Sequence, residues 1–326
     1  MAQAATRTRI TRRPVHGVLL LDKPLGWSSN DALQKAKWLL RAEKAGHTGT
    51  LDPLATGLLP LCFGAATKFS QVSLDADKAY RATVKLGERT STGDAEGNVI
   101  ETRPVDVTSE QLTAAMARLT GTIDQVPPMH SALKKDGKAL YEYARAGVEV
   151  DRPARRVTIH AITLVEQQGD TLVIDVRCSK GTYIRTLAED LGQLLGCGAH
   201  LSALRRTASG GLTLDGTVTI PQLEALADAE RLALLQPVDT LLSDWPRISL
   251  DDDNAAKFLA GMRRRLAQPD APAVRVYGPS AQAFLGSAHI TAGELIADRL
   301  LNPLEVQALL PGTPAHLATQ TTLAAA

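Results

Sequence analysis

Cysteine is scarce in this chain of 326 residues, and its three cysteines are far apart. Cys62, Cys178 and Cys197 are odd in number and widely spaced, so a disulfide framework is not expected. They form no CxxC pair, and the seven histidines show neither HxxxH nor HExxH spacing. Those are the common spacings of zinc ligands, so the sequence predicts packing cysteines and no metal site.

Long apolar runs are missing as well. No stretch approaches the ~20 consecutive apolar residues that a membrane-spanning helix needs. The first residues, MAQAATR, lack the apolar core of a secretory signal. Aromatic residues make up only 4% of the chain, but 44% of it is hydrophobic, enough for a sizeable buried core. We therefore expect a cytoplasmic protein without a membrane partner, long enough for two domains.

A strong excess of one charge is also absent. The formal net charge is +1, so bulk electrostatics do not indicate a nucleic-acid partner. Two local clusters are basic, in residues 1–15, which we expect to be a flexible arm, and in residues 125–156. Such clusters are more often solvated surface, although a local patch is enough to contact phosphates. Their cations are Arg7, Arg9, Arg12 and Arg13, then Lys134, Lys135, Lys138, Arg145, Arg152, Arg155 and Arg156.

Hydrophobic periodicity predicts a mixture of strands and helices. A capping-box sequence, Thr108-Ser-Glu-Gln111, marks one helix start, and the glycines and prolines of residues 45–64 predict an ordered loop. The fold class expected is α+β, with a large mixed, mainly antiparallel sheet flanked by helices. The predicted strands are 17–21, 80–86, 157–165 and 172–178, and the predicted helices begin at 28–30, 108 and 183.

The character of the sequence changes after Trp245. Short strand candidates at 274–277, 283–285 and 294–297 are separated by glycine and proline. We expect a small β-rich domain at 246–313, a disordered tail at 314–326, and a catalytic domain at 16–245.

The string from Gly46 to Pro60, GHTGTLDPLATGLLP, is the most informative in the chain. Its glycines allow the backbone to approach a ligand closely, and Pro53 fixes the turn beside a lone carboxylate, Asp52. An aspartate before proline is also a common turn former, so chemistry alone favours a structural role for Asp52.

The whole string resembles the catalytic-aspartate motif of the bacterial tRNA pseudouridine-55 synthases. The resemblance spans most of residues 16–245, and the C-terminal part is similar in size and position to the PUA-like RNA-binding domain of these enzymes. Further blocks that resemble the family follow the family order. They are GVLLLDKPLGWSS (17–29), KAYRATVKLG (78–87), QVPPMHSALKKDGKALYEYARAG (125–147), CSKGTYIRTLAEDLG (178–192) and ALRRTASG (203–210).

The resemblance implies an isomerase that converts uridine-55 of the tRNA T-arm into pseudouridine, with no metal or redox cofactor. A stacked base cannot be detached and rotated, so the nucleotide must be flipped into a pocket. A carboxylate then acts as nucleophile or base, and by resemblance Asp52 is that carboxylate. Attack at C1′, attack at C6 and removal of the C2′ proton all stay open, as does an additional role in tRNA folding.

The same resemblance assigns roles to four more residues around Asp52. Tyr80 would lie against the target base, and Tyr183 would be a second aromatic side chain in the pocket. Arg185 would pair with Asp52 and keep it ionised, and Asp94 would fix that arginine. Without the family motifs, two core tyrosines and an arginine paired within its own helix would be the simpler interpretations.

Other positions match the family less specifically. His47 would fill the space that the flipped base leaves, although a loop histidine that caps a turn is the alternative. Leu204 would be a pocket wall, and Lys23 and Lys68 would be basic positions near the site. His130 stands where many relatives have an aromatic residue, and we expect this departure to affect RNA contacts rather than chemistry.

Three alternatives to a stand-alone synthase fit the sequence less well. A zinc deaminase needs an HxE and PCxxC signature, which is absent. A non-catalytic RNA-binding module would not need the complete set of Asp52, Tyr80, Tyr183 and Arg185. Guide-dependent relatives lack a long insertion like that at 125–156. We therefore expect a monomer that binds the T-arm of tRNA without a guide RNA.

Overall fold

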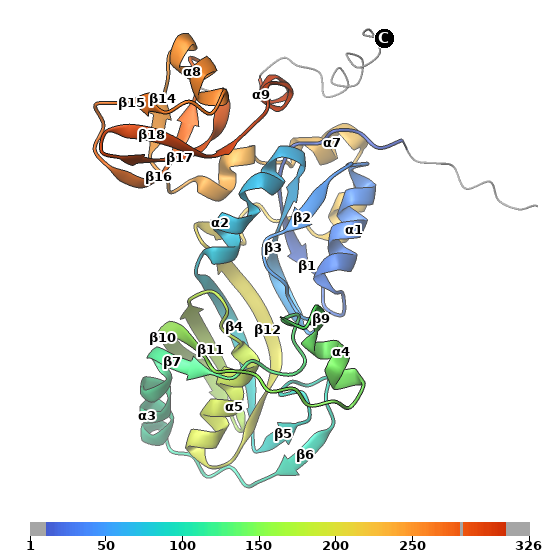
Figure 1. Cartoon of the computed structure of the whole chain (residues 1–326). Helices are drawn as coiled ribbons and strands as arrows, with labels where there is room; N and C mark the ends of the chain where they lie inside the picture. Colours follow the sequence, from blue (N-terminus) through green and yellow to red (C-terminus); the bar gives the residue numbers. More distant parts are fainter. Residues whose placement is uncertain (1–10, 281–282, 311–326) are drawn as a thin grey trace, which may run out of the picture.

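The computed structural model describes residues 11–280 and 283–310. Figure 1 shows an elongated molecule with a large part and a smaller part at one end, which is formed by the C-terminal residues. Arg7 and Arg9 of the predicted arm lie outside the described residues, as do the predicted tail and residues 311–313. No helix within the described residues is long and apolar enough to cross a membrane.

One large sheet organises the first part of the described chain. Its order is β1-β3-β12-β4-β11-β10-β7, with β2 paired to β3 and β13 to β12. The β3–β12 pairing is parallel, whereas the neighbouring pairings are antiparallel, which confirms the predicted mixed, mainly antiparallel α+β class. The strands are β1 (Gly17–Lys23), β2 (Ala45–His47), β3 (Ala55–Phe63), β4 (Lys78–Leu86), β7 (Gly121–Gln125), β10 (Arg155–Gln168), β11 (Thr171–Cys178), β12 (Ala199–Ser209) and β13 (Leu212–Thr213).

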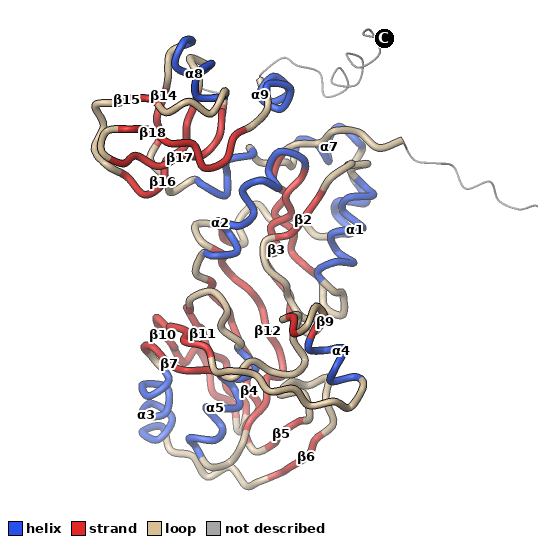
Figure 2. The backbone as a smooth tube through the Cα atoms, viewed as in Figure 1, coloured by secondary structure: helices blue, strands red, loops and turns tan. Residues whose placement is uncertain are grey.

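Helices cover the sheet at both ends (Figure 2). Helix α1 (Ser29–Leu39) begins after the N-cap Ser28, as predicted, and buries its apolar side against β1 and β3. The predicted capping box starts α3 (Ser109–Leu119), which packs with α5 (Ile184–Leu195) over the β4–β11 half of the sheet. The remaining elements are η1 (Gly64–Phe69), α2 (Ser70–Asp75), β5 (Glu88–Thr90), β6 (Val99–Thr102), α6 (Ile220–Ala225), α7 (Asp228–Ala233) and η2 (Val238–Leu242).

The ordered loop predicted for residues 45–64 is wrong for residues 45–47, which form β2, and for its second half. Residues 55–63 form β3, which is buried almost throughout. Its glycine and proline are compatible with a strand because of their positions. Gly57 lies where β12 approaches closely, and Pro60 offers its carbonyl to the Thr48 N–H, 3.1 Å away. Proline cannot donate a ladder hydrogen bond but it accepts one normally.

Residues 125–156 form an insertion between β7 and β10. Gln125 and Arg155, at its two ends, are paired across those strands. Inside it lie β8 (Lys134–Lys135), β9 (Lys138–Ala139) and α4 (Leu140–Arg145). Figure 1 shows α4 across the molecule from β7, towards the end of the sheet that β1 and β3 form.

The smaller part is built on a five-stranded sheet in the order β14-β16-β17-β18-β15, which confirms a small β-rich C-terminal domain. Its elements are β14 (Arg247–Ser249), α8 (Asp252–Leu259), β15 (Arg264–Arg265), β16 (Ala271–Tyr277), β17 (Phe284–Thr291), β18 (Glu294–Leu300) and α9 (Pro303–Leu309). Phe284 packs against Phe69 of the large part, with ring centroids 5.3 Å apart. This shared apolar cluster joins the two parts.

The described portion of the predicted basic arm is fixed to the large part. Arg13 forms two hydrogen bonds with Asp228, of 2.7 and 2.8 Å, and Arg12 donates to the Ala42 carbonyl at 2.9 Å. Val15 is buried. These two arginines therefore stabilise the chain's entry into β1.

Candidate active site

The loop between β2 and β3 carries Asp52 and is anchored to the first residue of α1 and to the turn before that helix. The Ser29 hydroxyl accepts from the Leu51 N–H at 2.7 Å and donates to the Leu51 carbonyl at 3.0 Å. Gly26 donates to the Pro53 carbonyl at 2.8 Å. Leu51 is buried, while the side chain of Asp52 keeps 41% of its surface exposed. The anchors on both sides of Asp52 therefore hold its carboxylate at an accessible position.

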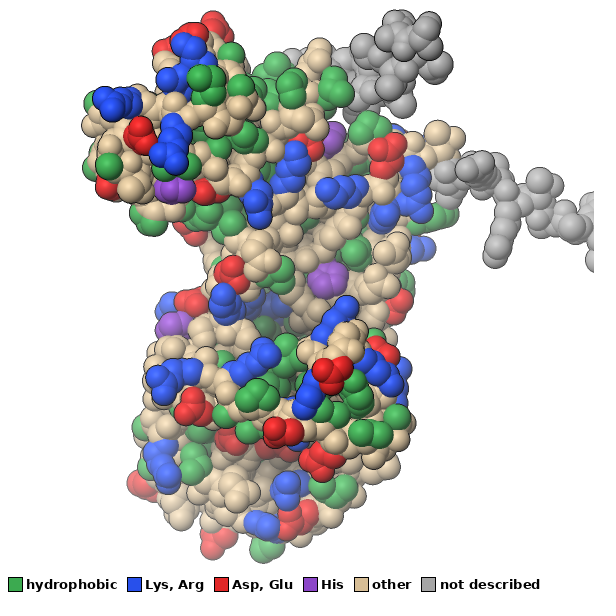
Figure 3. Space-filling view, viewed as in Figure 1, with side chains coloured by type: hydrophobic (Ala, Val, Ile, Leu, Met, Phe, Trp, Pro, Cys, Tyr) green, Lys and Arg blue, Asp and Glu red, His purple; other side chains and the backbone are tan. Residues whose placement is uncertain are grey.

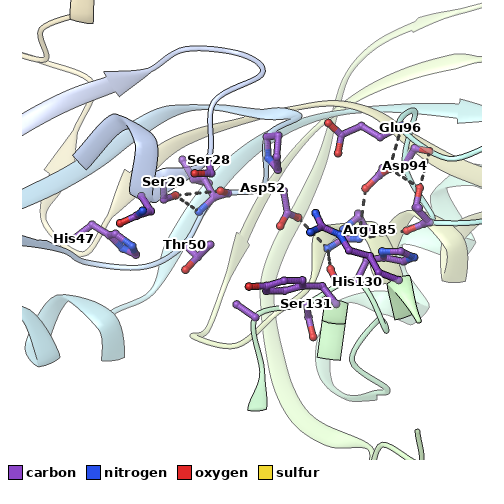
Figure 4. Close-up of a pocket in the computed structure, with 17 residues that line it drawn as sticks. Ser28, Ser29, His47, Thr50, Asp52, Asp94, Glu96, His130, Ser131 and Arg185 are labelled. Atoms are coloured by element: carbon purple, nitrogen blue, oxygen red, sulfur yellow. Dashed lines mark hydrogen bonds and ion pairs between the residues drawn. The ribbon is translucent and has the colours of Figure 1, made fainter. Parts of the chain in front are cut away.

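Arg185 lies at the centre of the site (Figure 4). Its Nη2 is 3.0 Å from Asp52 Oδ2, and its Nη1 is 3.4 Å from Asp94 Oδ2. The same guanidinium donates to the backbone carbonyls of Thr92 and His130. Only 5% of the arginine side chain is exposed, so its orientation is fixed by four acceptors on three segments.

Asp94 is itself held in place by its neighbours. Its Oδ1 accepts from the Thr92 hydroxyl at 2.6 Å and from the Glu96 N–H at 3.1 Å. Its backbone carbonyl accepts from the Thr90 hydroxyl at 2.7 Å. These bonds leave Oδ2 directed at Arg185, the pairing that the sequence predicted.

Burial raises the pKa of the Asp52 carboxyl above its usual value. Arg185 opposes this effect, while the negative charge of Asp94 adds to it. Lys23, also expected near the site, is completely buried and donates to the carbonyls of Pro24 and Trp27. Burial lowers the pKa of Lys23 to about 8, against the opposing effect of Asp52. The site therefore combines a carboxylate with two buried basic side chains.

Two cavities meet at Asp52 and Arg185, which line both. One, of about 520 Å³, lies between the α1 end of the sheet and the insertion. The other, of about 370 Å³, lies over β4 and β12. Figure 3 shows the molecule hollowed at this level, with Lys and Arg side chains on both sides of the hollow. The first is lined by residues that include Asn30, His47, Glu96, Tyr141 and Arg145, the second by Lys78, Tyr80, Tyr183, Leu204 and Arg206.

The structure brings the predicted pocket residues together in the second cavity. Tyr80 is on β4, and Leu204 is on β12, where it is paired with Ala55 of β3. Tyr183 precedes α5, and Gln125 fixes its backbone through two hydrogen bonds of 3.0 and 3.3 Å. This cavity has two aromatic rings and an aliphatic wall beside a carboxylate, which suits a flat heterocycle.

His47 lies at the end of β2 and lines the first cavity. Its Nδ1 is buried and has no hydrogen-bond partner among the described residues. Burial, with a contribution from the charge of Arg206, lowers the pKa of His47. The lowered pKa favours the neutral form of the imidazole beside the cavity.

Lys68 is not brought to this site. It lies in η1, where its Nζ bonds Glu305 at 2.6 Å and the Leu300 carbonyl at 3.0 Å. The expectation of a basic position near Asp52 is therefore wrong for Lys68, which ties the large part to the C-terminal domain. The sequence around Lys68 did not reveal its acidic partner, because Glu305 is far away in the chain.

His130 has a contact that the sequence did not predict. Its backbone carbonyl accepts a hydrogen bond from Arg185, and the residue lines the first cavity. The expectation that position 130 concerns RNA contacts alone is therefore incomplete, because the insertion reaches the charged centre.

Arg206 is a site residue that sequence reasoning left without a role. It lines the second cavity and is fully buried, whereas its neighbour Arg205 pairs with Asp22. Strand alternation holds the missing signal, because Arg206 falls on the same face of β12 as Leu204. Across residues 11–280 and 283–310, no group of three or more His, Cys, Asp or Glu side chains could hold a metal ion.

Comparison with family models matches three consecutive parts of the chain. Residues 37–184 match the N-terminal domain of the TruB family pseudouridylate synthases. Residues 185–243 match the tRNA pseudouridylate synthase B C-terminal domain, and residues 246–301 match "Pseudouridine synthase II TruB, C-terminal".

Curated relatives are similar over nearly the whole chain. A tRNA pseudouridine synthase B from Verminephrobacter eiseniae is 61% identical over 317 residues, covering 95% of this chain and 96% of that protein. One from Ralstonia nicotianae is 63% identical over 300 residues, covering 89% and 96%.

Solved structures with the same fold are more distant in sequence. The archaeal box H/ACA sRNP Nop10-Cbf5 complex matches with a TM-score of 0.64 at 24% identity, over 89% of this chain and 86% of the other. A Cbf5-Nop10-Gar1 complex matches with a TM-score of 0.67 at 24% identity, over 92% and 91%. At these identities the likeness establishes the fold alone.

Proposed function

This chain belongs to the TruB family of pseudouridylate synthases, and we propose that it isomerises uridine-55 in the T-arm of tRNA to pseudouridine with Asp52 as the catalytic carboxylate. The choice of tRNA is supported by the names of relatives about 60% identical to it, each a tRNA pseudouridine synthase B. The choice of uridine-55 rests on the resemblance of the GHTGTLDPLATGLLP string to the motif of that enzyme class.

The position of Asp52 is the main support for its role. Its carboxylate is 3.0 Å from a buried arginine and faces a cavity that contains Tyr80, Tyr183 and Leu204. A nucleotide flipped out of the T-loop would place its uracil among these side chains, with the ribose towards Asp52. Aromatic surfaces take up a base that has lost its stacking partners.

The reaction is balanced without a redox step. The N1–C1′ bond breaks, the uracil rotates, and C5 bonds to C1′. C5 then loses its proton, and N1 gains one. Asp52 serves as nucleophile or base during the exchange, and Arg185 and Asp94 fix its orientation. His47 and Lys23 are proposed to contact the RNA and to stabilise the charged centre, respectively.

The RNA is proposed to lie across the hollow of Figure 3, between the α1 end of the large sheet and the insertion. We assign catalysis to residues 16–245 and additional RNA binding to a PUA-like domain at 246–313. Lys134, Lys135 and Lys138 of the insertion have no carboxylate partner among the ion pairs of the described residues. Lys135 donates to the Asp151 carbonyl at 2.9 Å, and Lys138 lies over the Tyr143 ring. All three keep their positive charge unneutralised, which supports a role as phosphate contacts. The proposed enzyme works as a cytoplasmic monomer without a guide RNA.

The test is Asp52→Asn in a guide-free assay. The purified variant and wild type are incubated with T-loop RNA, and pseudouridine is mapped by position. We expect wild type to modify the bare T-arm stem-loop at position 55 and Asp52→Asn to bind it but form no product, because an amide is neither nucleophile nor base.

Asp175→Asn is the matched control, since Asp175 pairs with Arg81 on an exposed part of the sheet. Product from Asp52→Asn would refute the catalytic assignment. An inactive wild type on the bare stem-loop would refute the guide-free substrate.

A further inference from the structure

Arg206 is a buried cation that the proposed mechanism has not used. Its side chain is the largest of those fully buried in the described residues, with 1% exposure. Within those residues it forms no ion pair with a carboxylate. Burying a guanidinium without a carboxylate is costly unless its donors are well used. The N–H donors of Arg206 must therefore be satisfied by acceptors within the site.

Two hydrogen bonds and one neighbouring side chain connect Arg206 to three parts of the active site. Nε donates to the Leu58 carbonyl of β3 at 2.7 Å, and Nη2 donates to the Gly49 carbonyl at 3.2 Å. Gly49 belongs to the loop that carries Asp52. The third neighbour is Tyr80, which is the partner of Arg206 in the β4–β12 register and lines the same cavity.

The chemistry of the two groups fixes the direction of a hydrogen bond between them. A guanidinium has donors and no acceptor, so the Tyr80 oxygen must accept. The phenol's own proton then points away from Arg206. Both residues line the cavity that Asp52 also lines, so the open direction for this proton is into that cavity.

We propose that Arg206 is a positioning residue that holds the Tyr80 hydroxyl as an acceptor, so that the phenol presents its O–H to the flipped nucleotide as a hydrogen-bond donor. This inference rests on the proposed function. In it, Tyr80 contributes more than a stacking surface. Arg206 also couples the phenol to the Asp52 loop, since both share one guanidinium.

The first test is a double-mutant cycle between Arg206→Gln and Tyr80→Phe, measured as the single-turnover rate of pseudouridine formation on T-loop RNA. Alone, Arg206→Gln should slow the reaction at least about tenfold with little change in RNA affinity. In the Tyr80→Phe background it should cost less than about threefold, because the hydroxyl that it positions is gone. Arg206→Lys, which keeps the cation, should recover part of the rate.

The second test reads the phenol directly and needs no activity. Tyrosines are replaced by 3-fluorotyrosine, and the Tyr80 signal is assigned from its loss in Tyr80→Phe. Removing the Arg206 cation should raise the pKa of the Tyr80 phenol in a ¹⁹F NMR titration, since a nearby positive charge favours phenolate. Arg205→Gln, one residue away and paired with Asp22, is the matched control and should leave it unchanged.

Two results would overturn the inference. The first is that Arg206→Gln slows the reaction equally with Tyr80 and with Tyr80→Phe and leaves the phenol pKa unchanged. Arg206 would then act only by holding the carbonyls of Leu58 and Gly49. The other is failure of both Arg206 variants to fold, which assigns it to stability. Neither of these two results contradicts the proposed function. A wild-type protein that makes no pseudouridine would contradict the proposed function itself.

Discussion

Asp52 and Asp94 are held by one guanidinium, that of Arg185, with Nη2 3.0 Å from the first carboxylate and Nη1 3.4 Å from the second. The exposed carboxylate is thus linked to a buried one whose other oxygen is already hydrogen-bonded. The arrangement orients Asp52. Burial raises the pKa of its carboxyl, and the two neighbours act on that pKa in opposite directions.

Asp94→Asn should move the acid limb of the pH–rate profile to lower pH. The pKa of Asp52 is raised by burial and by the charge of Asp94, so removing that charge lowers the pKa and keeps Asp52 ionised in more acidic solution. The maximal rate should fall, because Arg185 loses an ionic partner. Single-turnover rates measured along the acid limb of the profile test this prediction, and a shift of that limb to higher pH would contradict it.

Tyr80→Phe and Tyr80→Ala should differ in RNA binding. The phenylalanine keeps the ring that stacks on the base, a contact of ~1–3 kcal/mol, so affinity should survive while the rate falls. The alanine should lose both. Filter binding of T-arm RNA and single-turnover rates separate the two effects, and equal affinities for the two variants would exclude a stacking role.

Neutralising Lys134, Lys135 and Lys138 together to glutamine should weaken RNA binding and flatten its salt dependence. Each lost phosphate contact removes roughly 0.7–0.9 from the log–log slope of affinity against salt. Salt titrations of binding provide the comparison. Lys85→Gln, which breaks an ion pair with Asp170 at the end of β4, is the control. Identical slopes for wild type and the triple variant would show that these lysines do not contact the RNA.

Gly57→Ala should destabilise the fold by about 2–5 kcal/mol through overpacking and backbone strain. Gly57 has a φ of +97°, and an added Cβ would lie 2.3 Å from the Arg206 carbonyl oxygen. Gly46→Ala in the same motif is the control, since a Cβ there meets nothing within 4 Å. Chemical denaturation measures both, and equal free energies of unfolding would show that the β3–β12 contact tolerates a methyl group.

Local patterns predicted much of the fold. The Thr108 capping box and the alternation at 80–86 correspond to real elements because each signal depends on neighbouring residues. Strand β3 was missed because Gly57 and Pro60 look like turn residues until the approach of β12 is known. Non-local pairing decided that element, and a single sequence does not display it.

The candidate site was predictable to a similar extent. Motif resemblance named Asp52, Asp94, Tyr80 and Arg185, and the structure places them together. The resemblance wrongly placed Lys68 near the site, because the ion-pair partner of Lys68 is Glu305, which lies far along the chain.

The pairing of Gln125 with Arg155 makes the insertion between them an outgrowth of a single hairpin. Its length can change by residues or by whole elements without shifting the register of any strand in the sheet, so topology leaves it free to diversify. One of its backbone oxygens, that of His130, nevertheless completes the acceptor set of Arg185. The insertion is therefore free to vary in length but constrained at this carbonyl. A redesigned insertion would need to place a carbonyl oxygen at the same position before any of its side chains were chosen.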